Sequence, residues 1–504
     1  MAESKFLFGA SVQGIQDFIF STNKLKEIIG ASSLIEKLCK DFFTEEIKNL
    51  TGSYDSSKLL LSAAGNMKYL FDSELHCKKF VKFFLKKASD YAPGIRVVQA
   101  TVKINGESLK SADFDLLEER LQIQKNKFLP QLNLGWMAFE RSRKTGKPAV
   151  SWNENVAFDK AQIVKKDNSE HKQLLNKIFP SDIAKNYHFK YPYELEDFSS
   201  SWMAVVHADG NNLGIKIQAM ADFYTNNPAQ TKGHSFHDAL KAFSETIDKA
   251  TEQAAQDAFN AVILPILNDI KVLPLRPVLL GGDDITLIIE AKYAFAFTHE
   301  YLSSFEKQTK IKFASFQNTF GFDGFNDGFT ACAGIAYIKK SYPFHYGAEL
   351  SEVLCSAGKK VAKHNTTKAP SCLYFYKVHS SYVTSSYDDL VKKELTIKFN
   401  NGNSIRIDGG PYFVNERDHS KTIAFLAGKV KALLASDAPK SPIRNWLSIL
   451  HKNPYQADLV LERINSVHKN FIGFSKDDCF FEQNGQKEMQ FTWVADAMTL
   501  TTFN

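Results

Sequence analysis

The chain has 504 residues, of which 44% are hydrophobic and 23% are charged, and its formal net charge is +6. This is an ordinary globular composition, which permits a nucleotide or nucleic-acid partner without requiring one. None of the six cysteines forms a C-x-x-C pair, so neither a zinc ribbon nor a disulfide framework is expected. The apolar runs are shorter than the ~20 residues of a membrane helix, and the N-terminus does not resemble a signal peptide, so we expect a cytoplasmic protein without membrane contact.

Residues 1–130 are expected to form a first α+β domain. Their order of strand, helices, hairpin, helix and strand matches the ferredoxin-like βαββαβ plan. Within the second helix, Leu34, Leu38 and Phe42 recur at helical spacing and should face the core. The expected elements are a strand over 5–11, helices from residue 12 and over 31–50, strands over 58–61 and 67–71, a helix over 73–90 and a strand over 95–104.

Residues 131–200 are expected to be a connecting module rather than a core. The run 141–147 is basic and turn-rich, and little periodicity follows it. A run of this kind is usually a solvated loop, and contact with an RNA backbone is the alternative.

Residues 201–400 are expected to repeat the plan of the first domain. Internal repeats of this kind decide the fold. The first copy has Ala63–Asn66 where the second has Gly281–Asp284, so only the second hairpin carries acids. The expected elements are a strand over 202–208, a turn at 209–214 into a helix, a helix over 234–263, the hairpin, a helix over 293–309, a strand over 330–338, a helix over 346–364 and a strand over 372–376.

Residues 401–504 are expected to form a small C-terminal helical domain. Amphipathic patterns cover 424–434, 442–450 and 455–467. The predicted fold class is therefore α+β, with two ferredoxin-like domains, a connecting module and a helical C-terminal domain.

The stretch Gly281–Asp284 lies between two apolar runs, 278–280 and 285–289, which predicts a β-hairpin with two carboxylates at its tip. Glycine permits a positive φ and lets a ligand approach the backbone. Adjacent carboxylates repel each other and are held together by a cation between them. Oxygen ligands suit Mg²⁺ or Mn²⁺. A solvated turn without catalytic function is the alternative.

Asp209 ends an apolar strand that the βαββαβ plan places beside the central hairpin. Asp209, Asp283 and Asp284 are therefore predicted to converge as catalytic residues and metal ligands. Such a group suits a two-metal site for transfer of a phosphoryl group to a hydroxyl. Gly210 and Gly214 leave backbone amides free at a helix start, which favours phosphate binding.

Together these motifs resemble the large, polymerase-like palm subunit of type III CRISPR effector complexes, especially the Cmr type. The resemblance covers most of the chain and depends on the order of the motifs. They are Val12–Gly14 through Gly30–Ser32, Ala63–Asn66, Ala208–Gly214, Gly281–Asp284, Ala333–Ala336 through Tyr342–Pro343, and Ala357–Lys360.

The resemblance implies two palm domains, of which the first is degenerate, with ATP bound between them. It implies that the acidic palm joins nucleotides into a cyclic oligoadenylate or a related adenylated messenger on sensing target RNA. Other CRISPR effector subunits, guide RNA and target RNA are the implied partners, and some relatives join ATP to S-adenosylmethionine. The residues predicted to bind nucleotide are Gly210, Asn211, Asn212, Gly214, Gly281, Gly282, Lys359 and Lys360.

Three features depart from the family pattern. The first palm starts at residue 5, so we expect a form without the N-terminal His-Asp nuclease domain, and His237-Asp238 is interpreted as helix surface. No cysteines flank 145–149, where the sequence resembles the family's zinc module, so no zinc is expected. Asn211 stands where relatives often have Asp, which leaves the number of metal ligands open.

Two further readings stay open at the level of the sequence. The palms could serve only as a scaffold for guide and target RNA, although the intact Asp283-Asp284 pair argues against this. The chain could be a stand-alone enzyme like the GGDEF diguanylate cyclases, although Asp284-Ile285 in place of Glu-Phe argues against that. His207, on the strand face of Asp209, could assist the chemistry, and a half-buried, hydrogen-bonded histidine is the alternative.

Overall fold

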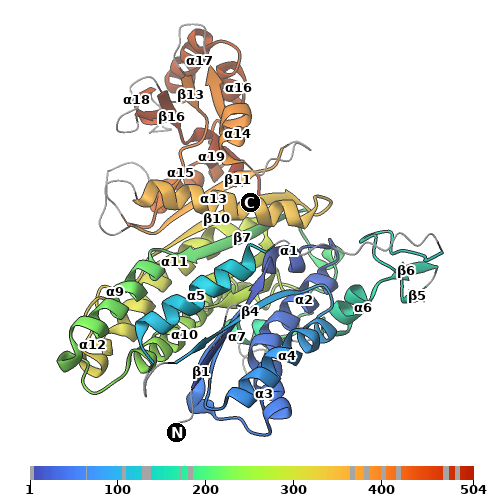
Figure 1. Cartoon of the computed structure of the whole chain (residues 1–504). Helices are drawn as coiled ribbons and strands as arrows, with labels where there is room; N and C mark the ends of the chain where they lie inside the picture. Colours follow the sequence, from blue (N-terminus) through green and yellow to red (C-terminus); the bar gives the residue numbers. More distant parts are fainter. Residues whose placement is uncertain are drawn as a thin grey trace.

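The computed structural model describes residues 5–503 apart from 64, 105–108, 128–137, 154, 171, 180–184, 364–368, 380–385, 399–403, 416–421, 469–475 and 483–488. Ala64 of the first predicted hairpin thus lies outside the described residues. Two sheets lie at the centre, with helices around them and a smaller part at one end (Figure 1). None of the described helices is both long and apolar enough to span a bilayer.

The first sheet is antiparallel and has the strand order β2-β3-β1-β4, as the ferredoxin-like plan requires. Its strands are β1 (Phe6–Gln13), β2 (Leu59–Ala63), β3 (Asn66–Phe71) and β4 (Arg96–Lys103). Side chains alternate across the sheet, so Phe8 packs on Phe43 and Phe80 of the helices on one face, while Leu7 shares the core of the other. Helices α1 (Ile15–Ile19), α2 (Leu25–Lys37), α3 (Phe43–Thr51) and α4 (Glu74–Tyr91) accompany it.

The predicted helix over 31–50 differs from the observed one. It begins earlier, at Leu25, and a π-helical turn over Leu38–Phe42 separates α2 from α3. An unpredicted helix, α5 (Ser111–Lys125), covers the second face of the first sheet. Its buried residues Phe114, Leu117 and Leu121 have helical spacing, so a signal was present in the sequence.

The second sheet has the order β14-β11-β10-β7-β9-β8. Its four strands β10-β7-β9-β8 follow the same connectivity as β4-β1-β3-β2 of the first sheet, so the two lobes share a topology. The strands are β7 (Trp202–Gly210), β8 (Leu275–Gly281), β9 (Asp284–Glu290), β10 (Ala331–Lys339), β11 (Cys372–Lys377) and β14 (Tyr412–Phe413). The helices are α9 (Leu213–Asn226), α10 (Phe236–Val262), α11 (Ala291–Phe313), α12 (Phe316–Phe320) and α13 (Phe344–Lys363).

The two lobes share their hydrophobic cores. Met203, Val205 and Val278 of the second sheet belong to the same buried cluster as Phe8 of the first. The hydroxyl of Ser32 on α2 donates a hydrogen bond to the carbonyl oxygen of Val278 on β8. These contacts hold the β2–β3 hairpin of the first lobe and the β8–β9 hairpin of the second in a defined relative position.

The connecting segment contains more structure than the sequence indicates. It holds α6 (Lys160–Asp167), α7 (Gln173–Ile178) and a two-stranded ribbon, β5 (Ser151–Asn153) and β6 (Val156–Phe158), that projects from the body (Figure 1). Helix α6 packs so closely on α2 that a Cβ on Gly30 would lie 1.6 Å from the carbonyl oxygen of Lys165. Short, basic elements of this kind carry little periodic signal.

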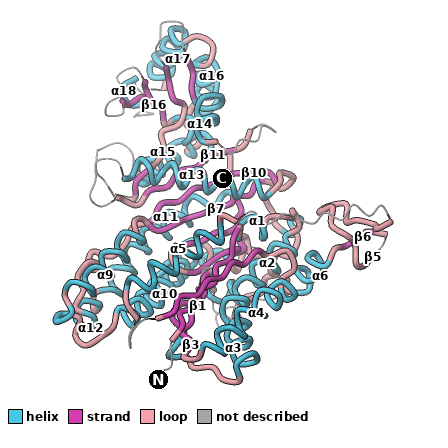
Figure 2. Tube along the Cα trace, viewed as in Figure 1, coloured by secondary structure: helices cyan, strands magenta, loops and turns pink. Residues whose placement is uncertain are grey.

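The C-terminal part contains the three predicted helices, α15 (Ile423–Leu434), α16 (Lys440–Leu450) and α17 (Pro454–Val467). It is not purely helical, however, because a mixed sheet of order β12-β13-β16-β15 lies among the helices (Figure 2). Its strands have only three or four residues, too few for an alternating pattern to stand out. They are β12 (Thr396–Lys398), β13 (Ser404–Arg406), β15 (Phe480–Glu482) and β16 (Met489–Thr492), with α14 (Tyr387–Leu390), α18 (Lys476–Cys479) and α19 (Val494–Thr501) nearby.

Candidate metal and nucleotide site

Three aspartates meet where β7 ends beside the β8–β9 hairpin. Strand β7 pairs with β9 up to Ala208 opposite Ile285, and Gly281 faces Asp284 across the hairpin. Each of Asp209, Asp283 and Asp284 offers a carboxylate oxygen, and these oxygens all lie within 4.8 Å of one another. The structure thus brings together the three residues that the sequence predicts to be neighbours.

Two glycines make this approach possible. A Cβ on Gly210 would lie 2.8 Å from Oδ2 of Asp283 and 2.9 Å from its Cβ, so any larger residue there would push Asp283 away. Gly282 adopts a φ of 64°, in the left-handed region that glycine enters without strain.

Helix α10 supplies two supports for the hairpin that sequence reasoning missed. The backbone N–H of Gly282 donates to Oδ1 of Asp248 at 3.0 Å, and the hydroxyl of Thr251 donates to the carbonyl oxygen of Gly282 at 2.6 Å. Asp248 and Thr251 are three residues apart and therefore share one helix face. Both bind backbone groups of Gly282, which lies more than 30 residues further along the chain, so no local sequence pattern reveals these contacts.

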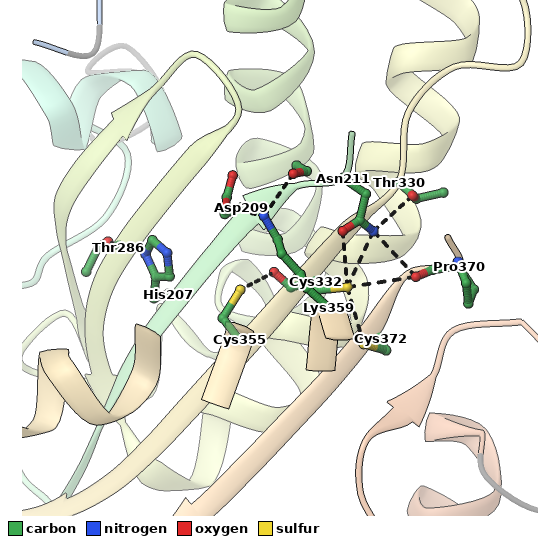
Figure 3. Close-up of polar contacts among 11 residues, drawn as sticks. His207, Asp209, Asn211, Thr286, Thr330, Cys332, Cys355, Lys359, Pro370 and Cys372 are labelled. Atoms are coloured by element: carbon green, nitrogen blue, oxygen red, sulfur yellow. Dashed lines mark hydrogen bonds and ion pairs between the residues drawn. The ribbon is translucent and has the colours of Figure 1, made fainter. Parts of the chain in front are cut away.

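Lys359 of α13 brings a positive charge to the cluster (Figure 3). Its ammonium forms an ion pair with Oδ2 of Asp209 and donates a 2.9 Å hydrogen bond to the carbonyl oxygen of Gly210. Burial by itself would lower the pKa of Lys359 and raise that of Asp209. The ion pair outweighs burial, so the pKa of Lys359 is raised and that of Asp209 is lowered.

The pKa values of the other two carboxyls, Asp283 and Asp284, are raised instead. Burial, with the charge of Asp209 beside it, raises the pKa of Asp283. Burial and the neighbouring charges of Asp283 and Asp209 raise the pKa of Asp284 well above its usual range. One lysine therefore does not compensate three carboxylates.

This arrangement fits a divalent cation. Oδ1 of Asp284 is buried and has no hydrogen-bond partner, and all candidate donors are oxygens, which Mg²⁺ and Mn²⁺ prefer. Among the described residues, no other trio of His, Cys, Asp or Glu side chains comes as close together.

The remaining predicted residues divide into two groups. Asn212, with a φ of 61°, immediately precedes α9. A Cβ on Gly214 would meet no atom within 4 Å, so the start of this helix is open. Gly281 lies at the hairpin tip, where a Cβ would approach Asp248 at 3.4 Å. Lys360, in contrast, is exposed on α13, and only its neighbour Lys359 reaches the aspartates.

Asn211 faces the interior instead of the acidic cluster (Figure 3). Its side chain is 3% exposed, and its amide donates to Oγ1 of Thr330 at 3.0 Å and approaches Sγ of Cys332 at 3.4 Å. Its backbone N–H is bonded to the carbonyl oxygen of Thr330. The geometry therefore lends no support to nucleotide or metal binding by Asn211, whose contacts join β7 to β10.

Two histidine questions from the sequence also have structural answers. Nδ1 of His207 lies 3.0 Å from Oγ1 of Thr286, and burial lowers the pKa of His207 to about 4. His237-Asp238 occupies the first turn of α10. Asp238 is exposed and caps the helix with Ser235, whereas His237 is half-buried, so the interpretation as helix surface is right for Asp238 only.

Comparisons with known proteins agree with this topology. Residues 202–369 match the family model described as Cas10/Cmr2, second palm domain. No curated protein matches the chain.

Similar folds occur among solved structures. The chain resembles one in a Csm1-Csm4 subcomplex of the type III-A CRISPR-Csm interference complex, with a TM-score of 0.58, 12% identity, and coverage of 99% of this chain and 70% of that one. A Csm1-Csm4 cassette in complex with cA4 gives a TM-score of 0.57, 12% identity, and coverage of 100% and 70%. A Csm1-Csm4 cassette in complex with one ATP gives a TM-score of 0.52 and 13% identity, with coverage of 100% of this chain and 70% of that one.

Proposed function

We propose that this chain, whose residues 202–369 form a second palm domain of the Cas10/Cmr2 family, is a subunit of a type III CRISPR effector complex. In that complex it acts as a metal-dependent nucleotidyltransferase. It converts ATP to a cyclic oligoadenylate or a related adenylated messenger when target RNA is sensed. The structures it resembles contain cA4 or ATP, which supports this class of substrate and product.

The observation that carries the proposal is the meeting of Asp209, Asp283 and Asp284 within 4.8 Å. A scaffold gains nothing from three mutually repelling, half-buried carboxylates, whereas phosphoryl transfer requires such ligands. A bound Mg²⁺ or Mn²⁺ would supply charge neutralisation on the transferred phosphoryl group and activation of the attacking hydroxyl.

The chain's own residues would orient the substrate. The open start of α9 at Asn212–Gly214 presents backbone N–H groups to phosphate oxygens. Lys359 stands beside Asp209 and provides a fixed positive charge for a polyphosphate. Asp248 and Thr251 hold the hairpin backbone, so the carboxylates stay in place while substrate binds. The contact between Nδ1 of His207 on β7 and Oγ1 of Thr286 on β9 joins the two strands beside the cluster.

The proposal is tested by incubating the assembled complex with ATP and Mg²⁺, with and without target RNA, and identifying products by mass spectrometry. RNA-dependent products containing 3′–5′ linked adenylates are expected from the wild-type protein. They should disappear in Asp283→Ala/Asp284→Ala. They should persist in the matched control Asp269→Ala/Asp323→Ala, which removes two exposed acids outside the cluster.

Three other outcomes separate the alternatives. An intact complex without any product would support a scaffold that only holds guide and target RNA. A product made from GTP without RNA would support a cyclase of the diguanylate type. An adduct formed only when S-adenosylmethionine is added would retain the transferase chemistry with a different acceptor.

A further inference from the structure

One lysine of the connecting segment reaches the β8–β9 hairpin. Helix α7 packs on both α10 and β8, and the side-chain amide of Gln256 on α10 donates a 2.7 Å hydrogen bond to the carbonyl oxygen of Lys177, near the end of α7. The ammonium of Lys177 lies 3.4 Å from the carbonyl oxygen of Leu280 on β8. Leu280 directly precedes Gly281, so Lys177 contacts the hairpin close to its acidic tip.

The ammonium of Lys177 lies among three acids from two other parts of the chain. It is 2.9 Å from Oε1 of Glu252 on α10 and 3.2 Å from Oε1 of Glu36 on α2 of the first lobe. Asp248, one helical turn before Glu252, also acts on its charge. Burial by itself would lower the pKa of Lys177, but the three negative charges outweigh burial and raise it. The three acids therefore share this one cation.

Little water can screen this group of charges. The side chain of Lys177 is 14% exposed and that of Glu36 is 9% exposed. The cavity beside them, which Asp248 and Gly281 also line, has a volume of about 40 Å³ and can hold only a few water molecules. Charges act strongly on one another where water is scarce, so the repulsion among the acids is offset mainly by Lys177.

Asp248 connects these charges to the backbone of the hairpin. Its Oδ1 accepts the 3.0 Å hydrogen bond from the backbone N–H of Gly282, the residue that precedes Asp283. Without the cation, the two neighbouring glutamates would repel the carboxylate of Asp248 and displace it from Gly282. A displaced Gly282 would move Asp283 away from the other two aspartates.

We propose that Lys177 is a positioning residue for the β8–β9 hairpin. It acts through Asp248 and through the carbonyl oxygen of Leu280, which fix the hairpin that carries two of the three clustered aspartates. Because Glu36 belongs to the first lobe, one cation joins the first lobe and the connecting segment to this hairpin. The catalytic consequence of this role rests on the proposed function, whereas the effect on the hairpin can be measured without substrate.

The first test measures amide hydrogen exchange of the full chain in EDTA, by mass spectrometry of peptides that cover residues 278–286. Lys177→Met should speed exchange in these peptides roughly fivefold, because the hydrogen bond of the Gly282 N–H is weakened. Lys177→Arg keeps the charge and should exchange like the wild type. The matched control Lys160→Met removes the same charge at an exposed position of α6 and should also exchange like the wild type.

The second test measures messenger synthesis by the assembled complex at varied Mg²⁺ and ATP concentrations. Lys177→Met should lower kcat about tenfold and raise the Mg²⁺ concentration for half-maximal rate, because two of the metal ligands are no longer held in place. Its KM for ATP should stay near the wild-type value. Lys177→Arg should recover both the rate and the Mg²⁺ dependence, and Lys160→Met should change neither.

Several results would overturn the positioning role. They are wild-type exchange of the hairpin in Lys177→Met, an equal rise of exchange in distant peptides such as those of α4, an Arg variant as impaired as the Met variant, or an active Lys177→Met complex with wild-type kcat and Mg²⁺ dependence. A wild-type complex that makes no messenger would instead overturn the proposed function. The exchange measurements would then still decide whether Lys177 positions the hairpin.

Discussion

The two lobes have the same strand order but differ at the three positions that form the aspartate cluster. Both hairpins close on equivalent pairs, Ala63 with Asn66 and Gly281 with Asp284. The pairing of Ser11 with Asn66 makes Ser11 the counterpart of Asp209. The residue three positions further on is left-handed in both lobes, Gly14 with a φ of 60° and Asn212 with 61°. The strand pairing and the left-handed residue after the first strand are thus repeated, whereas the hairpin tips differ, with the left-handed glycine at Gly65 in one lobe and one position earlier, at Gly282, in the other.

The side chains at these positions are satisfied in different ways. In the first lobe, the hydroxyl of Ser11 donates to the amide oxygen of Asn66 at 2.9 Å. This neutral pair needs no ion. In the second lobe, carboxylates crowd together and leave Oδ1 of Asp284 without a partner. The fold therefore forms without acids at these positions. Crowded like charges that the fold does not need are typical of functional sites.

The largest expected effect is on catalysis in the second lobe. Asp283→Asn should lower messenger synthesis about 10³-fold or more, because a metal ligand and its charge are lost. Ser11→Ala in the first lobe should instead cost only about 1 kcal/mol of unfolding free energy, the value of one hydrogen bond. ATP turnover and urea unfolding of both variants measure the contrast. Equal catalytic loss in both would show that the neutral pair has a chemical role.

The next effect concerns the closeness of the acids. Gly210→Ala should displace Asp283 and reduce messenger synthesis by roughly 10²-fold, because about 1 Å of misplacement has effects of this size. Gly428→Ala on α15, where a Cβ meets no atom within 4 Å, is the matched control and should retain wild-type activity. A fully active Gly210→Ala protein would contradict the assigned geometry.

A smaller effect is expected from the lysine of the cluster. Lys359→Met should lower the unfolding free energy by about 2 kcal/mol in EDTA, because three acids then lack any compensating charge. Millimolar Mg²⁺ should restore most of this loss by binding the folded state. Chemical denaturation in both buffers measures it. Equal destabilisation with and without Mg²⁺ would argue against a cation site.

The smallest effect concerns Lys165, the buried lysine on α6 of the connecting segment. The pKa of Lys165 is lowered to about 8, below its unfolded value, so the folded chain releases this proton before the unfolded chain does. Its contribution to stability is present above the unfolded pKa and is lost as pH falls through 8. Relative to Lys165→Met, the wild-type unfolding free energy should therefore rise by about 1.4 kcal/mol between pH 7 and 9. If the unfolding free energies of the two proteins change with pH in the same way, Lys165 is not buried as described.

The sequence predicts the parts of this protein that depend on nearby residues. Local patterns show the repeated order of strands and helices, the Gly281–Asp284 turn and the position of Asp209 near the end of β7, because apolar periodicity and turn residues act over short range. The convergence of the three acids also follows from the sequence once the sheet order is assumed. The short strands of the C-terminal sheet and the projecting ribbon do not, since three residues carry little periodic signal.

Tertiary structure alone decided what surrounds the acids. The ion pair of Lys359 with Asp209, the inward turn of Asn211 toward Thr330, and the support of Gly282 by Asp248 and Thr251 join residues from 31 to 150 positions apart. Lys165 is likewise buried where α6 packs on α2. The amino-acid pattern limits which residues can form the site. Packing decided which of them meet, because side-chain contacts across elements depend on how helices and sheets are placed in space rather than on spacing along the chain.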